Sequence, residues 1–179
     1  MISPEYRTLL LQLRAYRPQW GSTGDRWWKE VCDALHMSDS YSILDFGAGN
    51  GTLGVKLQQI KPEIEYTPYD PAMPGIDRLP EDRSDLVVAI DVMEHVEEEY
   101  IDEVLQSIYD RARKAVWLLI STVPAAQKLP DGRNAHISLF PASWWRRKLC
   151  EFVWDDYTAQ IEPNSLQFYA RKQEESSVE

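Results

Sequence analysis

The sequence predicts an α/β fold in which helices flank a mostly parallel β-sheet. Residues 42–46 and 84–91 are short, almost continuously apolar runs, which is typical of strands that are covered on both faces. A glycine-rich loop follows the first run, and Thr52–Ile60 then has the pattern of a helix. This order of strand, loop and helix forms the first half of a nucleotide-binding βαβ unit.

The glycine loop has the pattern Asp45-x-Gly47-x-Gly49-x-Gly51. A dinucleotide-binding loop instead has the pattern G-x-G-x-x-G and holds a pyrophosphate at a helix N-terminus. Here an acid ends the strand, and its charge would repel a phosphate but attract an ammonium group. A plain tight turn is the alternative interpretation of the glycines.

This loop resembles motif I of the class I S-adenosylmethionine (SAM)-dependent methyltransferases. In that family the loop passes the methionine part of the cofactor, and the acid holds the cofactor's amino group directly or through water. The resemblance implies a Rossmann-like methyltransferase sheet with SAM as its cofactor. It also implies that the following residues bind SAM: Asp45, Gly47, Ala48, Gly49, Asn50 and Gly51.

A second motif supports the resemblance. Residues 91–96 read D-V-M-E-H-V, similar to the family's D-x-x-E-H-V turn after the fourth strand, where the backbone contacts the cofactor. The resemblance therefore implies that Asp91 and Val92 contact SAM. His95 is a candidate catalytic base. In the alternative interpretation, His95 and Glu94 only orient the turn and cap the next helix.

Residues 63–70 predict the second strand, and Asp70 ends it where a Rossmann-like fold places its ribose-binding acid. A carboxylate there can accept hydrogen bonds from both ribose hydroxyls; the alternative is an ordinary loop carboxylate. We expect Pro71 to flank the adenine and Asp77 to approach the adenine amino group. Pro68 removes a ladder donor, so either the strand ends before it or this stretch is unpaired.

Two helices are expected before the glycine loop, over Ser3–Arg17 and from Asp25 to His36. Residues 1–40 would then correspond to the N-terminal helical lid found in many small-molecule methyltransferases. This placement puts Trp20 and Gly21 over the methionine end of the cofactor. Alternatively, Trp20 only packs the lid down.

The remaining elements follow the family's order. Residues 71–83 are short and rich in proline, so we expect the helix there to be lost and the third strand reduced. The sequence pattern predicts the fifth strand over residues 115–122 and a short helix over residues 141–149. Residues 151–161 and 165–171 predict a closing β-hairpin whose last strand is antiparallel.

A long loop follows the predicted fifth strand, at the edge of the sheet where such folds bind ligands. It brings Arg133, Asn134 and His136 close together in the sequence. These side chains can hold an acceptor substrate, and His136 is the better candidate for a general base. An ordered surface loop is the alternative.

Composition limits the possible functions. The 179 residues suit one compact domain, with residues 41–172 as the SAM-binding part and residues 173–179 as a disordered tail. A net charge of −10 argues against a duplex nucleic acid as partner. Two cysteines exclude a disulfide framework, and we expect no metal site. No signal peptide or membrane span is evident, so a cytoplasmic location is expected.

The sequence therefore predicts a SAM-dependent methyltransferase that acts on a small molecule, at oxygen or nitrogen. Two alternatives remain open: a SAM-binding sensor or subunit without transferase activity, and a nucleic-acid or protein methyltransferase. The N/D-P-P-Y/F motif of amino-group DNA methyltransferases is absent. The acceptor and the oligomeric state are not predicted.

Overall fold

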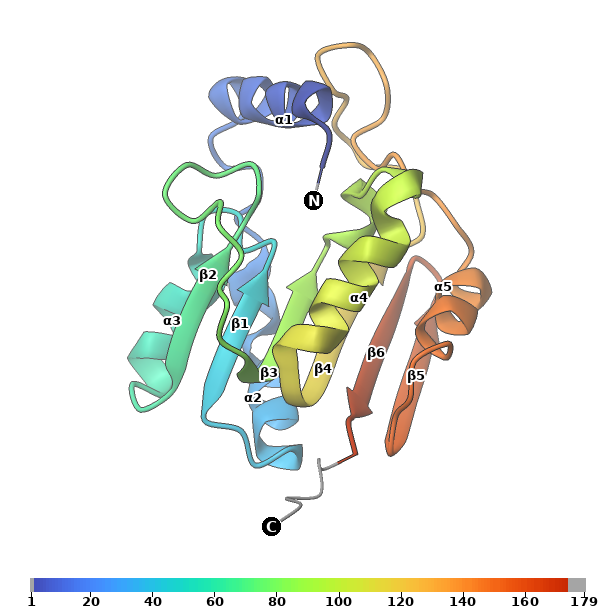
Figure 1. The fold of residues 1–179 in the computed structure, drawn as a ribbon. Helices are drawn as coiled ribbons and strands as arrows, with labels where there is room; N and C mark the ends of the chain where they lie inside the picture. The colour runs from blue at the N-terminus through green and yellow to red at the C-terminus, as the bar shows by residue number, and fades with distance from the viewer. Residues whose placement is uncertain (1, 174–179) are drawn as a thin grey trace.

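The structure is a computed structural model, and it describes residues 2–173. This part of the chain forms one six-stranded sheet in the order β2-β1-β3-β4-β6-β5 (Figure 1). Neighbours from β2 to β4 are parallel, and β6 is antiparallel to both of its neighbours, as predicted. The strands are β1 (Ser42–Phe46), β2 (Glu65–Tyr69), β3 (Ser84–Ile90), β4 (Ala112–Ser121), β5 (Asp156–Glu162) and β6 (Ser165–Arg171).

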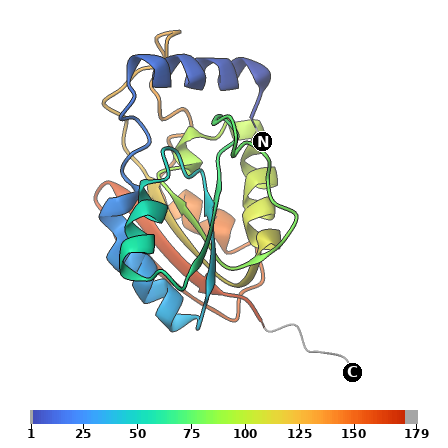
Figure 2. The same ribbon diagram turned by 90° about the vertical axis from the view of Figure 1, so that its left-hand side faces the viewer.

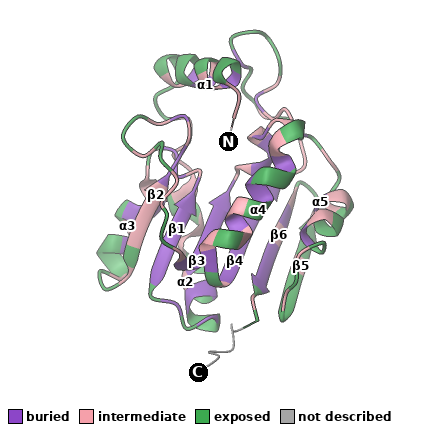
Figure 3. Cartoon of the chain, viewed as in Figure 1, coloured by how far each residue is buried: buried purple, intermediate pink, exposed green. Residues whose placement is uncertain are grey.

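Helices cover both faces of the sheet. Figure 2 shows the sheet edge-on between two helical layers, and in Figure 3 the central strands are almost wholly buried. Successive β1 residues point to opposite faces: Ile43 packs with α2 and α3, whereas Leu44 and Phe46 pack with α4 and α5. The helices are α1 (Pro4–Tyr16), α2 (Trp28–Met37), α3 (Thr52–Ile60), α4 (Ile101–Arg111) and α5 (Ala142–Leu149), with short 3₁₀ turns η1 (Gly24–Trp27), η2 (Met93–His95) and η3 (Glu98–Tyr100).

The helix α1 lies across the carboxyl ends of the parallel strands, at the top of Figure 1. Ser3 caps its start, and the Ser3 backbone N–H donates to the Glu97 carboxylate at 2.7 Å. Its apolar face packs on residues from two distant loops; this cluster contains Tyr6, Leu10, Leu13, Ala72, Leu129 and Ala135. By contrast, α2 packs against the sheet. Within residues 1–40, therefore, α1 but not α2 covers the strand ends.

Proline is tolerated in β2 because β2 is an outer strand of the sheet, where one side of the backbone needs no partner. Pro68 pairs with Asp45, and the strand continues to Tyr69. The alternative that the strand ends before Pro68 is therefore wrong. Residues 70–83 contain neither helix nor strand, so the third strand of the family pattern is absent here.

The closing hairpin is shorter than predicted, because β5 begins at Asp156. Phe152 and Trp154 precede the strand, and both pack on the Tyr109 ring of α4 with centroids 5.1 Å away. The alternation of these two aromatic residues in the sequence therefore reflects packing in this aromatic cluster and not a strand. The predicted tail falls on residues 174–179 beyond Gln173, which lie outside the described residues. Within residues 2–173, no helix has the length and apolarity to cross a bilayer.

Candidate active site

A cavity of about 690 Å³ lies under α1, at the carboxyl ends of the parallel strands. This is the edge at which open α/β sheets bind ligands. Its walls come from α1 and residues 16–24, the glycine loop, the end of β2, residues 90–96 and the loop after β4. Of the residues predicted to bind SAM, these line it: Asp45, Gly47, Ala48, Gly49, Asp70, Pro71, Asp91, Val92, Trp20 and Gly21.

The glycines of the loop are required by its backbone and its packing. Gly47, Gly49 and Gly51 have φ angles of +82°, +55° and +69°, a region that other residues rarely adopt. A Cβ atom on Gly49 would lie 2.4 Å from the carbonyl oxygen of Gly21. One on Gly47 would lie 2.4 Å from Val92 Cγ2. The loop is thus closely packed between the lid segment and the turn after β3.

Asn50 fastens this loop to the segment that follows α1. Its backbone N–H donates to the Gly21 carbonyl at 3.0 Å. Its side-chain amide donates to the Pro18 carbonyl at 2.8 Å and to Ser22 Oγ at 2.6 Å. Neither Asn50 nor Gly51 lines the cavity among the described residues, and the contacts of Asn50 in this structure are those that hold the loop to the lid segment.

Asp45 is buried at the end of β1, with only 4% of its surface exposed. Its carboxylate accepts a hydrogen bond of 2.5 Å from the Tyr66 hydroxyl. Burial raises the pKa of Asp45 to about 6, and the Tyr66 hydrogen bond acts in the opposite direction. A buried carboxylate beside a cavity is well suited to pair with a ligand's ammonium group.

Asp70 joins α1 to the glycine loop. Its Oδ2 accepts from Arg14 Nη2 at 2.8 Å and from the Gly49 N–H at 3.0 Å, and its Oδ1 accepts from the Ala72 N–H at 2.9 Å. A carboxylate offers about four acceptor positions. Binding both ribose hydroxyls therefore requires Arg14 to shift.

Arg14 itself was not singled out from the sequence. It lines the cavity, and its guanidinium carbon lies 5.2 Å from the centre of the Trp20 ring. Its Nε and Nη1 are buried without a hydrogen-bond partner in the described structure. These two donors can hold an anionic group of a ligand.

Asp91 directly follows β3 and has a φ of +53°, which is strained for a residue other than glycine. Its N–H donates to the Leu119 carbonyl at 3.0 Å, and its Oδ2 accepts from the Thr23 hydroxyl at 3.3 Å. Burial raises the pKa of Asp91. Next to it, Trp20 meets His95 edge-on, with ring centroids 5.3 Å apart.

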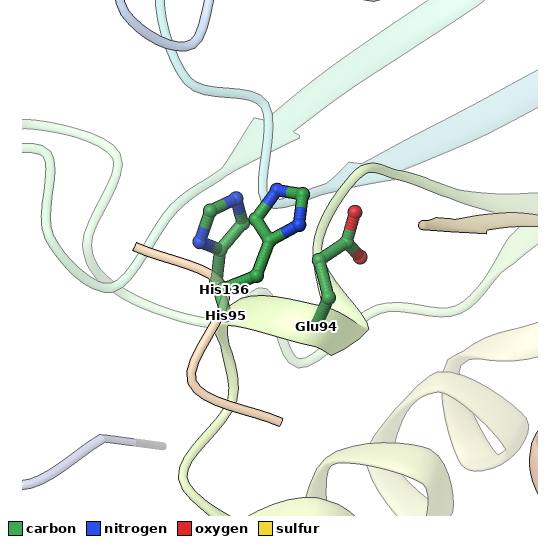
Figure 4. Close-up of side chains that lie close together, drawn as sticks. All are labelled: Glu94, His95 and His136. Carbon is green, nitrogen blue, oxygen red and sulfur yellow. The ribbon is translucent and has the colours of Figure 1, made fainter. Parts of the chain in front are cut away.

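His95 and His136 both line the cavity, and their ring centroids lie 4.7 Å apart (Figure 4). His95 Nδ1 lies 2.7 Å from the Ala135 carbonyl oxygen, and His136 Nδ1 lies 2.6 Å from that of Val123. A carbonyl can only accept, so each Nδ1 carries a proton, and in the neutral form of each ring Nε2 has the free lone pair. Burial lowers the pKa of His95 to about 4.

Glu94 completes this group, and it is fully buried. Its Oε1 accepts from the Ser121 N–H at 3.1 Å, while its Oε2 has no hydrogen-bond partner in the described structure. One ligand-type atom each of Glu94, His95 and His136 lies within 4.8 Å of the others. The sequence led us to expect no metal site; the fold nevertheless brings three ligand-type side chains together from η2 and the loop after β4.

Three predicted residues have other partners. Arg133 pairs with Asp131 at 2.7 Å, and Asp77 pairs with Arg7 at 2.6 Å. Asn134 accepts from the backbone N–H groups of residues 125 and 136, each at 2.9 Å, and so positions the His136 backbone. Among the described residues none of the three lines the cavity, so this structure gives no contact in support of the expected substrate and adenine roles.

Comparisons with known proteins agree with this geometry. The model of a family described as "Methyltransferase domain" matches residues 5–152. No curated protein matches the sequence. An O-methyltransferase family protein from Burkholderia thailandensis has a similar structure, with a TM-score of 0.61 at 10% identity over 86% of this chain and 59% of its own.

Two further solved structures are similar. Human N-acetylserotonin methyltransferase, in complex with SAM, gives a TM-score of 0.56 at 14% identity over 83% of this chain and 53% of its own. The DhpI–SAH complex gives a TM-score of 0.54 at 16% identity over 94% of this chain and 96% of its own. The chain thus spans just over half the length of the first two proteins. At these identities the likeness shows the fold.

Proposed function

Because the chain belongs to the methyltransferase-domain family, whose Rossmann-like class uses SAM, we propose that it methylates a small molecule held in the cavity under α1. The acceptor atom is an oxygen or a nitrogen. The observation that carries this proposal is a single cavity that is lined both by the glycine loop and by two adjacent imidazoles.

The residues around the glycine loop fit SAM. The Asp45 carboxylate would hold the cofactor's ammonium group, and Asp70 would hold the ribose hydroxyls. The unpaired donors of Arg14 would hold the carboxylate. Gly47, Ala48 and Gly49 line the cavity, so a ligand can lie directly against the backbone of the glycine loop. When bound, SAM supplies an electrophilic methyl group on a sulfonium sulfur.

The two imidazoles suit an acceptor. The free Nε2 atoms of His95 and His136 can accept a proton from a hydroxyl or an amine. His136 is the better base, because burial lowers the pKa of His95 and so weakens it as a proton acceptor. The protein otherwise contributes by positioning donor and acceptor for in-line displacement.

Cavity size and coverage favour a small acceptor. A volume of about 690 Å³ falls within the range of roughly 300–1,000 Å³ that is common for small-ligand pockets. The helix α1 lies over the strand ends and is fixed there by the Ser3–Glu97 and Arg14–Asp70 contacts. The Burkholderia protein described as an O-methyltransferase family member is consistent with oxygen as the acceptor atom.

The proposal is tested by incubating the protein with methyl-labelled SAM and a fractionated metabolite extract. We expect label in a small product, which mass spectrometry identifies, and an equal amount of S-adenosylhomocysteine. Asp45→Asn, which removes the charge for the ammonium group, is the matched control and should yield no label. Tight SAM binding without any labelled small molecule would contradict the proposal.

A further inference from the structure

We propose that Glu94, His95 and His136 bind one divalent transition-metal cation at the proposed acceptor site in the cavity. This site deepens the proposed function and rests on it, since the cation would select acceptors that carry an oxygen ligand. Figure 4 shows the carboxylate and the two rings side by side. The ligand atoms would be Glu94 Oε2 and the two Nε2 atoms.

The hydrogen bonds around the group leave one free ligand atom on each side chain. The carbonyls of Ala135 and Val123 engage the Nδ1 atoms and so leave both Nε2 lone pairs free. The Ser121 N–H engages only one oxygen of Glu94. Metal-binding histidines usually donate their other N–H to a carbonyl or carboxylate in this way.

The unpaired carboxylate oxygen needs an explanation. Glu94 is 0% exposed, and its Oε2 has no hydrogen-bond partner in the described structure. A buried acceptor without a partner is costly, and buried charges are normally paired or coordinate metals. No Lys or Arg side chain pairs with Glu94 in the described part of the chain, whereas a cation between Glu94 and the two imidazoles would satisfy it.

The distances permit a cation. Ligand bonds of about 2.0–2.2 Å place ligand atoms about 3–4 Å apart around one ion. One ligand-type atom of each of the three side chains lies within 4.8 Å of the others, so modest side-chain rotations would bring all three to coordination distance. Two imidazoles and one carboxylate favour Zn²⁺, Mn²⁺, Fe²⁺ or Co²⁺ over Mg²⁺ and Ca²⁺.

The site would keep an open coordination position. Only three protein ligands are present in the group, and His95 and His136 both line the cavity. Three protein ligands with an open position are typical of catalytic sites. A hydroxyl or carboxylate oxygen of the acceptor can occupy that position.

The cation would change how the acceptor loses its proton. With both Nε2 atoms occupied, neither histidine can act as the base. A hydroxyl that ligates a cation has a lowered pKa and gives its proton to water. The acceptor oxygen then forms its bond to the methyl carbon as the carbon–sulfur bond breaks, and the thioether leaves.

Calorimetry on chelator-treated protein tests the site without SAM or any acceptor. Titration with Zn²⁺, Mn²⁺ and Co²⁺ should give one site per chain with micromolar or tighter affinity for at least one ion. Glu94→Gln and His136→Ala should each weaken binding by at least about 100-fold. The matched control is His36→Ala, an exposed histidine at the end of α2, and it should bind like the unchanged protein.

Absence of binding up to roughly 0.1 mM of all three ions would overturn the inference. Binding that Glu94→Gln and His136→Ala both leave intact would also overturn it. Circular dichroism and SAM affinity check that the variants are folded. If the protein binds no cation but transfers methyl groups without metal, the cation site is refuted and the proposed function stands. If the protein binds a cation but transfers no methyl group, the cation site stands and the proposed function is refuted.

Discussion

Two regions around the cavity differ in how their polar groups are satisfied. Around the glycine loop, protein partners occupy most donors and acceptors, with Arg14 Nε and Nη1 as the exception: the Gly47 and Ala48 N–H groups donate to the Tyr69 carbonyl, and Asp70 accepts from Gly49 and Arg14. Around His95 and His136, the bonds at Nδ1 leave the Nε2 atoms of both histidines free, and Glu94 Oε2 is buried and unpaired.

This difference indicates that the two groups of residues have separate roles, one in binding and one in catalysis. Apart from Arg14, which must shift to free Asp70 for the ribose, the residues around the glycine loop are held by protein contacts before a ligand arrives, which favours binding affinity. The two histidines keep lone pairs available, which favours chemistry. Changes to the first group should therefore alter SAM affinity, and changes to the second should alter turnover.

The largest effect is expected from Gly49→Ala, which disturbs the packing of the glycine loop. Its Cβ atom would lie 2.4 Å from the Gly21 carbonyl oxygen, so the lid segment must move away. We expect SAM affinity to fall by at least about 100-fold, or about 2.7 kcal/mol, in calorimetry.

The matched control is Gly51→Ala in the same loop. Gly51 also has a positive φ, of +69°, but a Cβ atom there would meet nothing within 4 Å. It should cost about 1–2 kcal/mol of folding free energy from backbone strain and leave SAM affinity nearly unchanged. Equal losses of affinity in both variants would show that strain alone, not the close approach to the lid, is responsible.

His136→Ala should produce the opposite pattern. We expect kcat on the identified acceptor to fall by about 10²-fold, whether His136 accepts a proton or holds a cation. SAM affinity should stay within about two-fold, because the hydrogen bonds of His136 go to Asn134 and Val123 and not to the residues proposed to hold SAM. A large loss of SAM affinity with normal kcat would refute the separation of roles.

The sequence predicted the glycine loop far better than the group around the histidines. Residues 42–60 carry the strand, the loop and the helix in one continuous stretch, so β1 and α3 begin and end where the pattern placed them. The group around the histidines joins η2 to a loop forty residues later. Periodicity and spacing do not show such a contact, and they led us to expect no metal ligands.

Side-chain roles were harder to predict than elements. Arg133 and Asn134 lie beside His136 in the sequence, yet only His136 lines the cavity. A loop residue can face solvent, backbone or cavity, and that choice depends on turns such as the Asp131–Arg133 pair. Arg14 was missed because a cation in an amphipathic helix normally indicates a solvent-exposed face.

Asp70→Asn should weaken SAM binding by about 1.5–3 kcal/mol, the range for hydrogen bonds to a charged group. Asp77→Asn is the control, since Asp77 pairs with Arg7 outside the cavity. Calorimetry should show less than about a two-fold change for this second variant. Because Asp70 also holds Arg14, thermal unfolding must be measured alongside affinity. Unchanged affinity for Asp70→Asn would exclude the ribose role.

The smallest predicted effect is a pH dependence of SAM affinity that is caused by protonation of the Asp45 carboxylate. Burial raises the pKa of this carboxyl to about 6, and its neighbours are the Tyr66 hydroxyl and the Asp70 charge. Only the ionised carboxylate attracts an ammonium group, so affinity should fall by about ten-fold for each pH unit below this midpoint. Calorimetry between pH 5 and 8 should show this fall, and Asp45→Asn should remove it.

The folding free energy should respond in the opposite direction. Because the folded pKa of Asp45 lies above the unfolded value, its protonation stabilises the fold at low pH, and this stabilisation is lost as the pH rises through about 6. Asp45→Asn should therefore raise the unfolding temperature at pH 8 while it abolishes tight SAM binding. Its amide oxygen can still accept from Tyr66. A gain in stability at the expense of binding would mark Asp45 as a functional carboxylate, whereas a loss of both would assign it a purely structural role.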